Sequence, residues 1–143
     1  EGDEAYFGWA SRTRRLGGIA RNAMAENLSA LELTQALVRF DTINPPGNER
    51  LCAEHLSRIL EDAGFAVSYH AFAESRTSLV ARIGGEADAK PLCFTGHIDT
   101  VPLGAAPWSV DPFAADIADC TLYGRGASDM TSGVAALDRE SVV

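Results

Sequence analysis

The chain has 143 residues, a length that fits one small domain or part of a larger one. Hydrophobic residues make up 46% and charged residues 22%, which excludes a disordered or collagen-like polymer. Acidic residues outnumber basic ones, 20 against 12, and the formal charge of -8 at pH 7 excludes nucleic acid as an expected partner, because it would repel a phosphate backbone. No apolar run approaches the ~20 residues that cross a bilayer, and no signal-peptide pattern opens the sequence. We therefore expect no membrane partner and a cytoplasmic location.

The first predicted helix follows a segment without a recognisable pattern. Residues 1–27 contain a short basic run that is typical of a solvated surface, and they are left unassigned. Ser29 and Glu32 have the spacing of a capping box, and apolar residues recur at three and four positions up to Phe40. The pattern predicts a helix from about Ser29 to Phe40, within a domain over residues 28–143.

A break and a second helix come next. The sequence DTINPPGN over residues 41–48 ends the first helix, and Asn48 is a candidate N-cap for the second. From Cys52 to Ala63, apolar residues recur at i, i+4, i+7, i+8 and i+11. Gly64 stands where a glycine commonly ends a helix, so this helix is predicted to stop there.

Three strands are expected after the second helix. Apolar and polar residues alternate over residues 65–71, which predicts a half-exposed strand, and a second strand is expected over residues 78–83. Leu92–Thr95 is a short run without alternation, which is typical of a strand covered on both faces in a parallel sheet. The fold class is therefore α/β, with a mostly parallel sheet flanked by helices.

The last third of the chain is predicted to alternate loops with short elements. Residues 101–112 carry three prolines and read as a long irregular loop. A hairpin is expected over residues 116–123, turning at Asp119 and Cys120. The apolar run at residues 134–137 indicates the start of a further helix.

The three cysteines, Cys52, Cys93 and Cys120, are widely spaced, and no two of them form a CxxC pair. This spacing favours neither a disulfide framework nor a thiolate zinc site. We expect reduced thiols that act as small core residues.

His97 and Asp99 stand at the carboxyl end of the predicted buried strand, where open α/β sheets place ligand sites. A neutral imidazole is a good zinc ligand, and a nearby carboxylate can accept its other N–H and orient the ring. A lone His-x-Asp also occurs as an ordinary surface or capping pair. The other histidines, His55 and His70, are predicted to be packed or solvated and to lie outside any site.

A second segment, GRGASDM, strengthens the metal interpretation. Gly124 and Gly126 allow a tight turn that presents Asp129 just before the predicted helix. The carboxylate of Asp129 could bridge two divalent cations, and paired metals promote amide hydrolysis. Asp129 could instead cap the helix, and the local sequence leaves both roles open. The metal interpretation requires the side chains of His97 and Asp129 to lie together.

Four segments together resemble the M20 family of metallopeptidases. In chain order they are TINPPGNE at residues 42–49, GHIDTVPLG at 96–104, PWSVDPF at 107–113 and LYGRGASDMTSGVAA at 122–136. The similarity runs from about Leu31 to Leu137. It is closest to the acetylornithine deacetylase and succinyl-diaminopimelate desuccinylase branch, whose members hydrolyse the amide of N-acylated amino acids at a two-metal centre.

The resemblance implies roles for three residues. His97 would bind one metal, Asp99 would be the catalytic-site carboxylate that orients His97, and Asp129 would bridge both metals. It also implies two Zn²⁺ ions per complete site, with Co²⁺ or Mn²⁺ as alternatives for such ligands. The substrate would be a small N-acyl amino acid or peptide, and full-length members would be homodimers. The peptide bond between Asp129 and Met130 is expected to be cis, as it often is in the family.

The resemblance further implies that the chain is the front part of a zinc-peptidase-like catalytic domain, without the lid and dimerisation domain. In the family, a pair of glutamates that includes the general base, a further carboxylate ligand and a distant His lie downstream of the matched segments, whereas this sequence stops at Val143. We therefore predict a truncated and inactive part of the hydrolase. Two positions depart from the family pattern, Thr131 in place of a frequent Lys and Cys120 in place of a frequent Gly.

Two other functions stay open at this point. A non-catalytic remnant or interaction fragment is favoured by the incomplete set of ligands. An aminoacylase or carboxypeptidase of the same family would share these front-half motifs, because substrate specificity depends on residues outside them.

Overall fold

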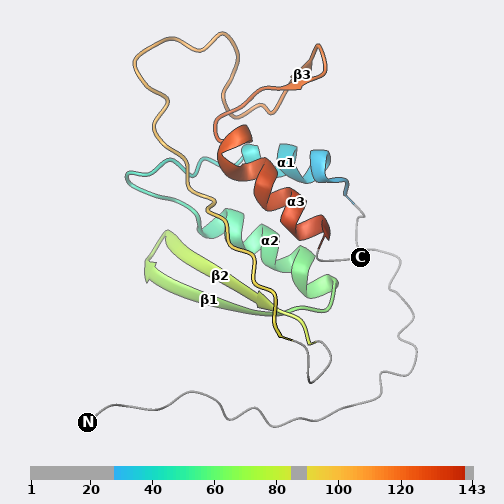
Figure 1. Cartoon of the computed structure of the whole chain (residues 1–143). Helices are drawn as coiled ribbons and strands as arrows, with labels where there is room; N and C mark the ends of the chain where they lie inside the picture. Colours follow the sequence, from blue (N-terminus) through green and yellow to red (C-terminus); the bar gives the residue numbers. More distant parts are fainter. Residues whose placement is uncertain (1–27, 85–89, 141–143) are drawn as a thin grey trace.

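The structure is a computed structural model that describes residues 28–84 and 90–140 (Figure 1). Its elements are α1 (Ala30–Val38), α2 (Arg50–Asp62), β1 (Ala66–Ala73), β2 (Arg76–Arg82), β3 (Ile117–Ala118), β4 (Thr121–Leu122), the π-helical turn η1 (Ala127–Thr131) and α3 (Ser132–Glu140). Helix α3 packs on α1, and α2 packs on the β1–β2 hairpin (Figure 1). The unassigned residues 1–27 lie outside the described part.

The helices begin and end largely where the sequence predicts. The capping box of α1 is present, with Ser29 Oγ accepting from the Glu32 N–H at 3.2 Å and the Ser29 N–H donating to Glu32 Oε2 at 2.7 Å. Helix α2 ends at Asp62 with Ala63 as its C-cap, and Gly64 follows at a φ of 93°. The prediction of Asn48 as the N-cap is wrong: Glu49 holds that position without a side-chain capping bond, because its carboxylate binds Arg76 instead.

The core lies between the helices and is contributed by all three of them. Its buried members are Leu33, Leu37, Cys52, Leu56 and Ala135, and partly buried Leu28, Phe40, Ile59, Leu79, Ile98 and Val134 pack around them. Ile98 and Val134 belong to the two segments that carry the candidate site. The two segments of the site are therefore anchored to the hydrophobic core through these side chains.

An ion pair fixes the β1–β2 hairpin to the start of α2. Arg76 donates from Nη2 to Glu49 Oε1 at 3.0 Å, and its Nε lies 3.2 Å from the same oxygen. Glu49 is only 4% exposed, so this charge depends on its partner. A Cβ at Gly47 would lie 2.4 Å from Arg76 Nε, and glycine leaves room for the guanidinium.

The predicted mostly parallel sheet is wrong for the described residues. Strands β1 and β2 pair antiparallel, with Tyr69 opposite Leu79, and β3 pairs antiparallel with β4. An isolated parallel bridge joins Ile43 to Thr100. Helices and short antiparallel hairpins thus make up this α/β chain.

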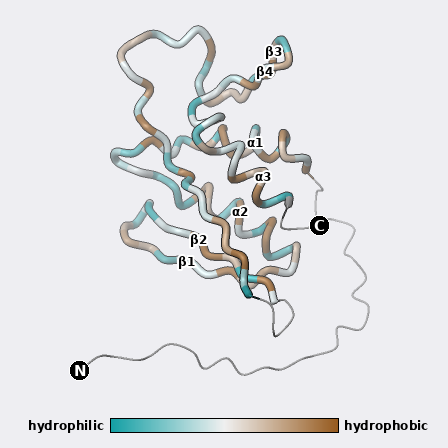
Figure 2. The backbone as a smooth tube through the Cα atoms, in the orientation of Figure 1, coloured by the Kyte–Doolittle hydropathy of each residue, from teal (hydrophilic) through white to brown (hydrophobic). Residues whose placement is uncertain are grey.

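The predicted buried strand at Leu92–Thr95 is extended but exposed and unpaired. Leu92 is 79% exposed and Phe94 52% exposed, and Figure 2 shows the hydrophobic stretch in the segment that runs past α2. A run of apolar residues becomes a buried strand only when neighbouring strands cover it. Among residues 28–84 and 90–140, no strand pairs with this segment.

The remaining short elements agree with the sequence. Residues 101–112 form an irregular loop, which the Trp108 indole N–H stabilises by donating to the Leu103 carbonyl at 3.1 Å. The hairpin β3–β4 turns at Asp119 and Cys120, with φ values of 50° and 59°. Helix α3 is longer than the predicted start at residues 134–137.

All three cysteines are free thiols, as predicted, but only Cys52 is a core residue. Cys93 and Cys120 are exposed, so their predicted place in the core is wrong. Cys93 belongs to the uncovered extended segment, and Cys120 lies at a hairpin tip. Burial, with a smaller contribution from the charge of Glu49, raises the pKa of the Cys52 thiol to about 12. Within the described residues, no helix is long and apolar enough to span a membrane.

Candidate metal centre

Two glycines let the segments of the candidate site approach each other closely. Gly126 has a φ of 80°, and a Cβ there would lie 2.5 Å from Thr100 Cγ2. A Cβ at Gly96 would lie 3.0 Å from Val134 Cγ2. Any larger residue would have to push the two segments apart. The loop that leaves the extended segment therefore lies directly against the turn before α3.

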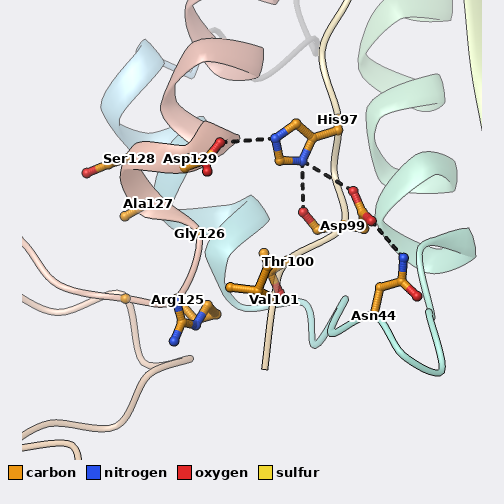
Figure 3. A pocket seen from close by; sticks show the side chains of 11 residues that line it. Asn44, His97, Asp99, Thr100, Val101, Arg125, Gly126, Ala127, Ser128 and Asp129 are labelled. Atoms are coloured by element: carbon orange, nitrogen blue, oxygen red, sulfur yellow. Dashed lines mark hydrogen bonds and ion pairs between the residues drawn. The ribbon is translucent and has the colours of Figure 1, made fainter. Parts of the chain in front are cut away.

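This approach brings together the three residues that the sequence singles out. His97 Nε2 lies 3.1 Å from Asp129 Oδ1. On the other side of the ring, His97 Nδ1 lies 3.0 Å from the Asp99 carbonyl oxygen and 3.2 Å from Asp99 Oδ1. Figure 3 shows the imidazole between the two aspartates.

The backbone around Asp129 presents its carboxylate toward the imidazole. Asp129 and Met130 have non-helical dihedral angles inside the η1 turn, and the peptide bond between them is cis, as the family resemblance implies. The Asp129 side chain is 89% exposed, and the N-cap of η1 is Gly126. The side chain of Asp129 thus faces His97, and Gly126 rather than Asp129 is the N-cap of η1.

The electrostatics of the imidazole favour a cation between His97 and Asp129. The pKa of His97 is raised, chiefly because the Asp99 carbonyl accepts a hydrogen bond from the ring, with a further contribution from Asp129. With the proton of the neutral ring on Nδ1, the lone pair of Nε2 would face a carboxylate oxygen. Two acceptors at 3.1 Å repel each other unless a proton or a metal ion lies between them.

The distance between the two acceptors fits a shared metal ion. Two atoms bound to one zinc ion at about 2.0–2.1 Å in near-tetrahedral geometry lie about 3.3 Å apart. The observed 3.1 Å between Nε2 and Oδ1 is close to this value. However, the described residues include no group of three His, Cys, Asp or Glu side chains placed to hold a metal. They therefore bring together two acceptors, His97 Nε2 and Asp129 Oδ1, at this point.

A pocket of about 410 Å³ opens beside these three residues. Its lining also includes Asn44, Thr100, Val101 and the segment 124–128. Within this lining Arg125 carries a permanent positive charge. Its guanidinium stacks on Trp108 at 5.0 Å and donates to the Pro102 carbonyl at 3.1 Å, which fixes it beside the pocket.

Sequence reasoning missed Asn44 and Arg125 as pocket residues. Asn44 Nδ2 donates to Asp99 Oδ2 at 2.9 Å, across 55 positions of sequence. Both residues lie within segments that carry the family resemblance, but no spacing rule connects either of them to His97. The parallel bridge that brings Asn44 to Asp99 has no local sequence signal.

The segments that form the site lie in a stretch of the chain that matches a known peptidase family. Residues 93–139 match the model of peptidase family M20/M25/M40. This match supports the resemblance of the chain to the M20 family.

Within that family, the chain is similar to succinyl-diaminopimelate desuccinylases. It is 40% identical over 114 residues to the desuccinylase of Wolbachia sp. subsp. Brugia malayi, an alignment that covers 76% of this chain and 27% of the relative. It is 43% identical over 115 residues to the desuccinylase of Phenylobacterium zucineum, and this alignment covers 79% of the chain and 29% of the relative. It is 44% identical over 113 residues to the desuccinylase of Rhodopseudomonas palustris strain HaA2, and this alignment covers 75% of the chain and 28% of the relative. The chain spans less than a third of the length of these curated relatives.

Proposed function

We propose that the site belongs to a metal-dependent hydrolase that cleaves the amide bond of a small N-acyl amino acid. The observation that carries this proposal is the 3.1 Å contact between His97 Nε2 and Asp129 Oδ1, with Asp99 on the other ring nitrogen. A metal ligand commonly has this arrangement, with its second N–H bound to a carboxylate or carbonyl oxygen.

Each of the three residues has a defined part in this proposal. His97 would bind one metal through Nε2, and Asp129 would bridge two ions with its two oxygens. The carbonyl oxygen of Asp99 at 3.0 Å and its Oδ1 at 3.2 Å from His97 Nδ1 would hold the ring so that the Nε2 lone pair is directed at the metal position. Two zinc ions are proposed, with cobalt or manganese as alternatives. The bound ions would polarise the amide carbonyl, and they would lower the pKa of a metal-bound water to near neutrality.

The pocket supports a small anionic substrate. Its volume of about 410 Å³ is that of a small-molecule site. The fixed guanidinium of Arg125 suits the carboxylate of an N-acyl amino acid. The relatives are succinyl-diaminopimelate desuccinylases by name, which supports a succinylated amino acid over the substrates of an aminoacylase or carboxypeptidase.

We further propose that this chain by itself has little or no hydrolytic activity. Catalytic zinc sites normally have three protein ligands, and the described residues group two acceptors at the site. The complete enzyme is proposed to be a cytoplasmic homodimer that acts on a small molecule.

Zinc binding to the purified chain tests the proposal. We expect equilibrium dialysis to show zinc uptake that falls at least about tenfold in His97→Ala and in Asp129→Ala, because each variant removes one of the two acceptors. His70→Ala is the matched control, since His70 is exposed on β1, and it should bind zinc like the original chain. Equal binding in all four proteins would refute the metal site.

A second candidate is a non-catalytic chain, which the absence of a third ligand among the described residues favours. It predicts a chain that binds no zinc and releases no product from N-succinyl amino acids. Turnover that a chelator abolishes would exclude it.

A further inference from the structure

Asn44 contacts the candidate site from a part of the chain remote in sequence. It lies in the loop between α1 and α2, and its Nδ2 donates to Asp99 Oδ2 at 2.9 Å (Figure 3). Asp99 Oδ1, the other oxygen of the same carboxylate, lies 3.2 Å from His97 Nδ1. The two oxygens of Asp99 thus have different partners, one fixed by an amide and the other facing the imidazole.

The backbone holds Asn44 in place independently of its side chain. The Asn44 N–H donates to the Thr100 carbonyl at 2.8 Å, and the Thr100 N–H donates to the Thr42 carbonyl at 3.0 Å. These are the bonds of the parallel bridge between Ile43 and Thr100. Because Thr100 is the next residue after Asp99, the bridge places the Asn44 amide directly beside the Asp99 carboxylate.

The chemistry of the amide suits orientation. A carboxylate can rotate about its terminal torsion, which is broad. A donor that holds Oδ2 restricts this rotation and keeps Oδ1 on the side of the imidazole. The amide carries no net charge, so it leaves the negative charge of Asp99 available to His97. A lysine at the same place would compete with the imidazole for that charge.

We propose that Asn44 is a positioning residue for His97, acting through Asp99. This inference rests on the proposed function, since its purpose is to hold Nε2 of His97 toward a metal. The chain of contacts runs from the Asn44 amide to Asp99, from Asp99 to the imidazole, and from the imidazole to the metal position beside Asp129.

Zinc affinity tests the proposal, measured by competition with a chromophoric chelator. Asn44→Ala is expected to weaken zinc binding about tenfold, the lower end of the effect seen when the partner of a ligating histidine is removed. Asn44→Asp should weaken it further, because two carboxylates would then face each other. Asn48→Ala, an exposed asparagine of the same loop, is the matched control and should leave the affinity unchanged.

A double-mutant cycle separates positioning from a general structural role. If Asn44 acts through Asp99, then Asn44→Ala should have no further effect on zinc affinity in an Asp99→Ala chain. If the two losses simply add, the proposal is overturned. Unfolding in urea identifies any variant whose loss of binding reflects loss of folding.

A zinc-free measurement keeps the inference distinct from the proposed function. In ¹⁵N-correlated NMR spectra, Asp99→Ala should move the side-chain amide signal of Asn44 to that of a solvated amide. Asn44→Ala should shift the ring proton signals of His97. Signals that stay in place would overturn the inference. A chain that binds no zinc would refute the proposed metal site, while the NMR comparison would still decide the role of Asn44.

Discussion

The helix and hairpin region, residues 28–84, and the site region, residues 90–131, are held in place by different kinds of contact. The first contributes the apolar faces of α1 and α2, which form the core together with α3, and its hairpin is fixed by the Glu49–Arg76 pair. The second has little buried surface, and it depends on the close backbone approach that Gly126 allows. Stability and site geometry therefore respond to different substitutions, which makes the two separable by experiment.

The largest expected loss of stability is in the helix and hairpin region. Leu33 is 0% exposed, so Leu33→Ala should lower the free energy of unfolding by about 3 kcal/mol through lost burial and the cavity left behind. Leu51→Ala is the control, because Leu51 lies on α2 but is 59% exposed, and its effect should be within about 0.5 kcal/mol. Urea denaturation measures both. Similar losses would mean that the apolar face of the helices is misplaced.

The site region should instead respond at a glycine. Gly126→Ala combines a left-handed φ with a 2.5 Å approach to Thr100 Cγ2, so we expect a loss of about 2–3 kcal/mol together with lost zinc binding. Gly104→Ala has a similar φ of 84° but open space around the new Cβ, so it should cost only about 1 kcal/mol and spare zinc binding. Equal zinc affinity in the two variants would show that the close approach does not shape the site.

A gain of stability is expected at the β3–β4 turn. Asp119 and Cys120 both have positive φ, the geometry of a two-residue hairpin turn in which Asp-Gly is strongly favoured. Cys120→Gly should therefore raise the free energy of unfolding by about 1 kcal/mol by removing the left-handed side chain. Cys93→Ala, an exposed cysteine outside any turn, should change it little. A loss of stability in Cys120→Gly would contradict the turn geometry.

The smallest expected effect is a pH dependence of the free energy of unfolding that arises from His55 in α2. Burial, and then the nearby charge of Arg58, lowers the pKa of His55, so the folded chain resists a proton that the unfolded chain accepts. The stability due to neutral His55 is full above about pH 6.5 and falls as the pH drops below it. His55→Gln should lose less stability than the original chain between about pH 7.5 and about pH 5.5. His70→Gln, on exposed β1, should follow the original chain, and identical curves for all three would contradict the assignment.

Much of the helix and hairpin region could be predicted because its signals are local. The capping box at Ser29, the periodicity of α2 and the glycine at residue 64 each depend on neighbours within a few positions. The prediction of a buried strand at Leu92–Thr95 was wrong for a physical reason. Its composition describes a covered strand, but covering depends on other strands, and the described residues place none beside it.

The candidate site was predictable only in part. His97, Asp99 and Asp129 follow from motif chemistry and from the family resemblance, and the structure places their side chains within contact distance. Their roles as ligands and orienting group stay predictions. Asn44 could not be found from the sequence, because its contact with Asp99 depends on the parallel bridge at Thr100, a pairing between distant segments.

The uncovered segment around Leu92 and Phe94 has a consequence for the behaviour of the chain in solution. Exposed apolar side chains in a segment that pairs with no described strand favour association with other polypeptides. Each molecule carries a formal charge of -8, and the resulting repulsion between molecules opposes this association at low ionic strength. Added salt screens that repulsion, so we expect aggregation through this exposed segment to increase with protein concentration and ionic strength.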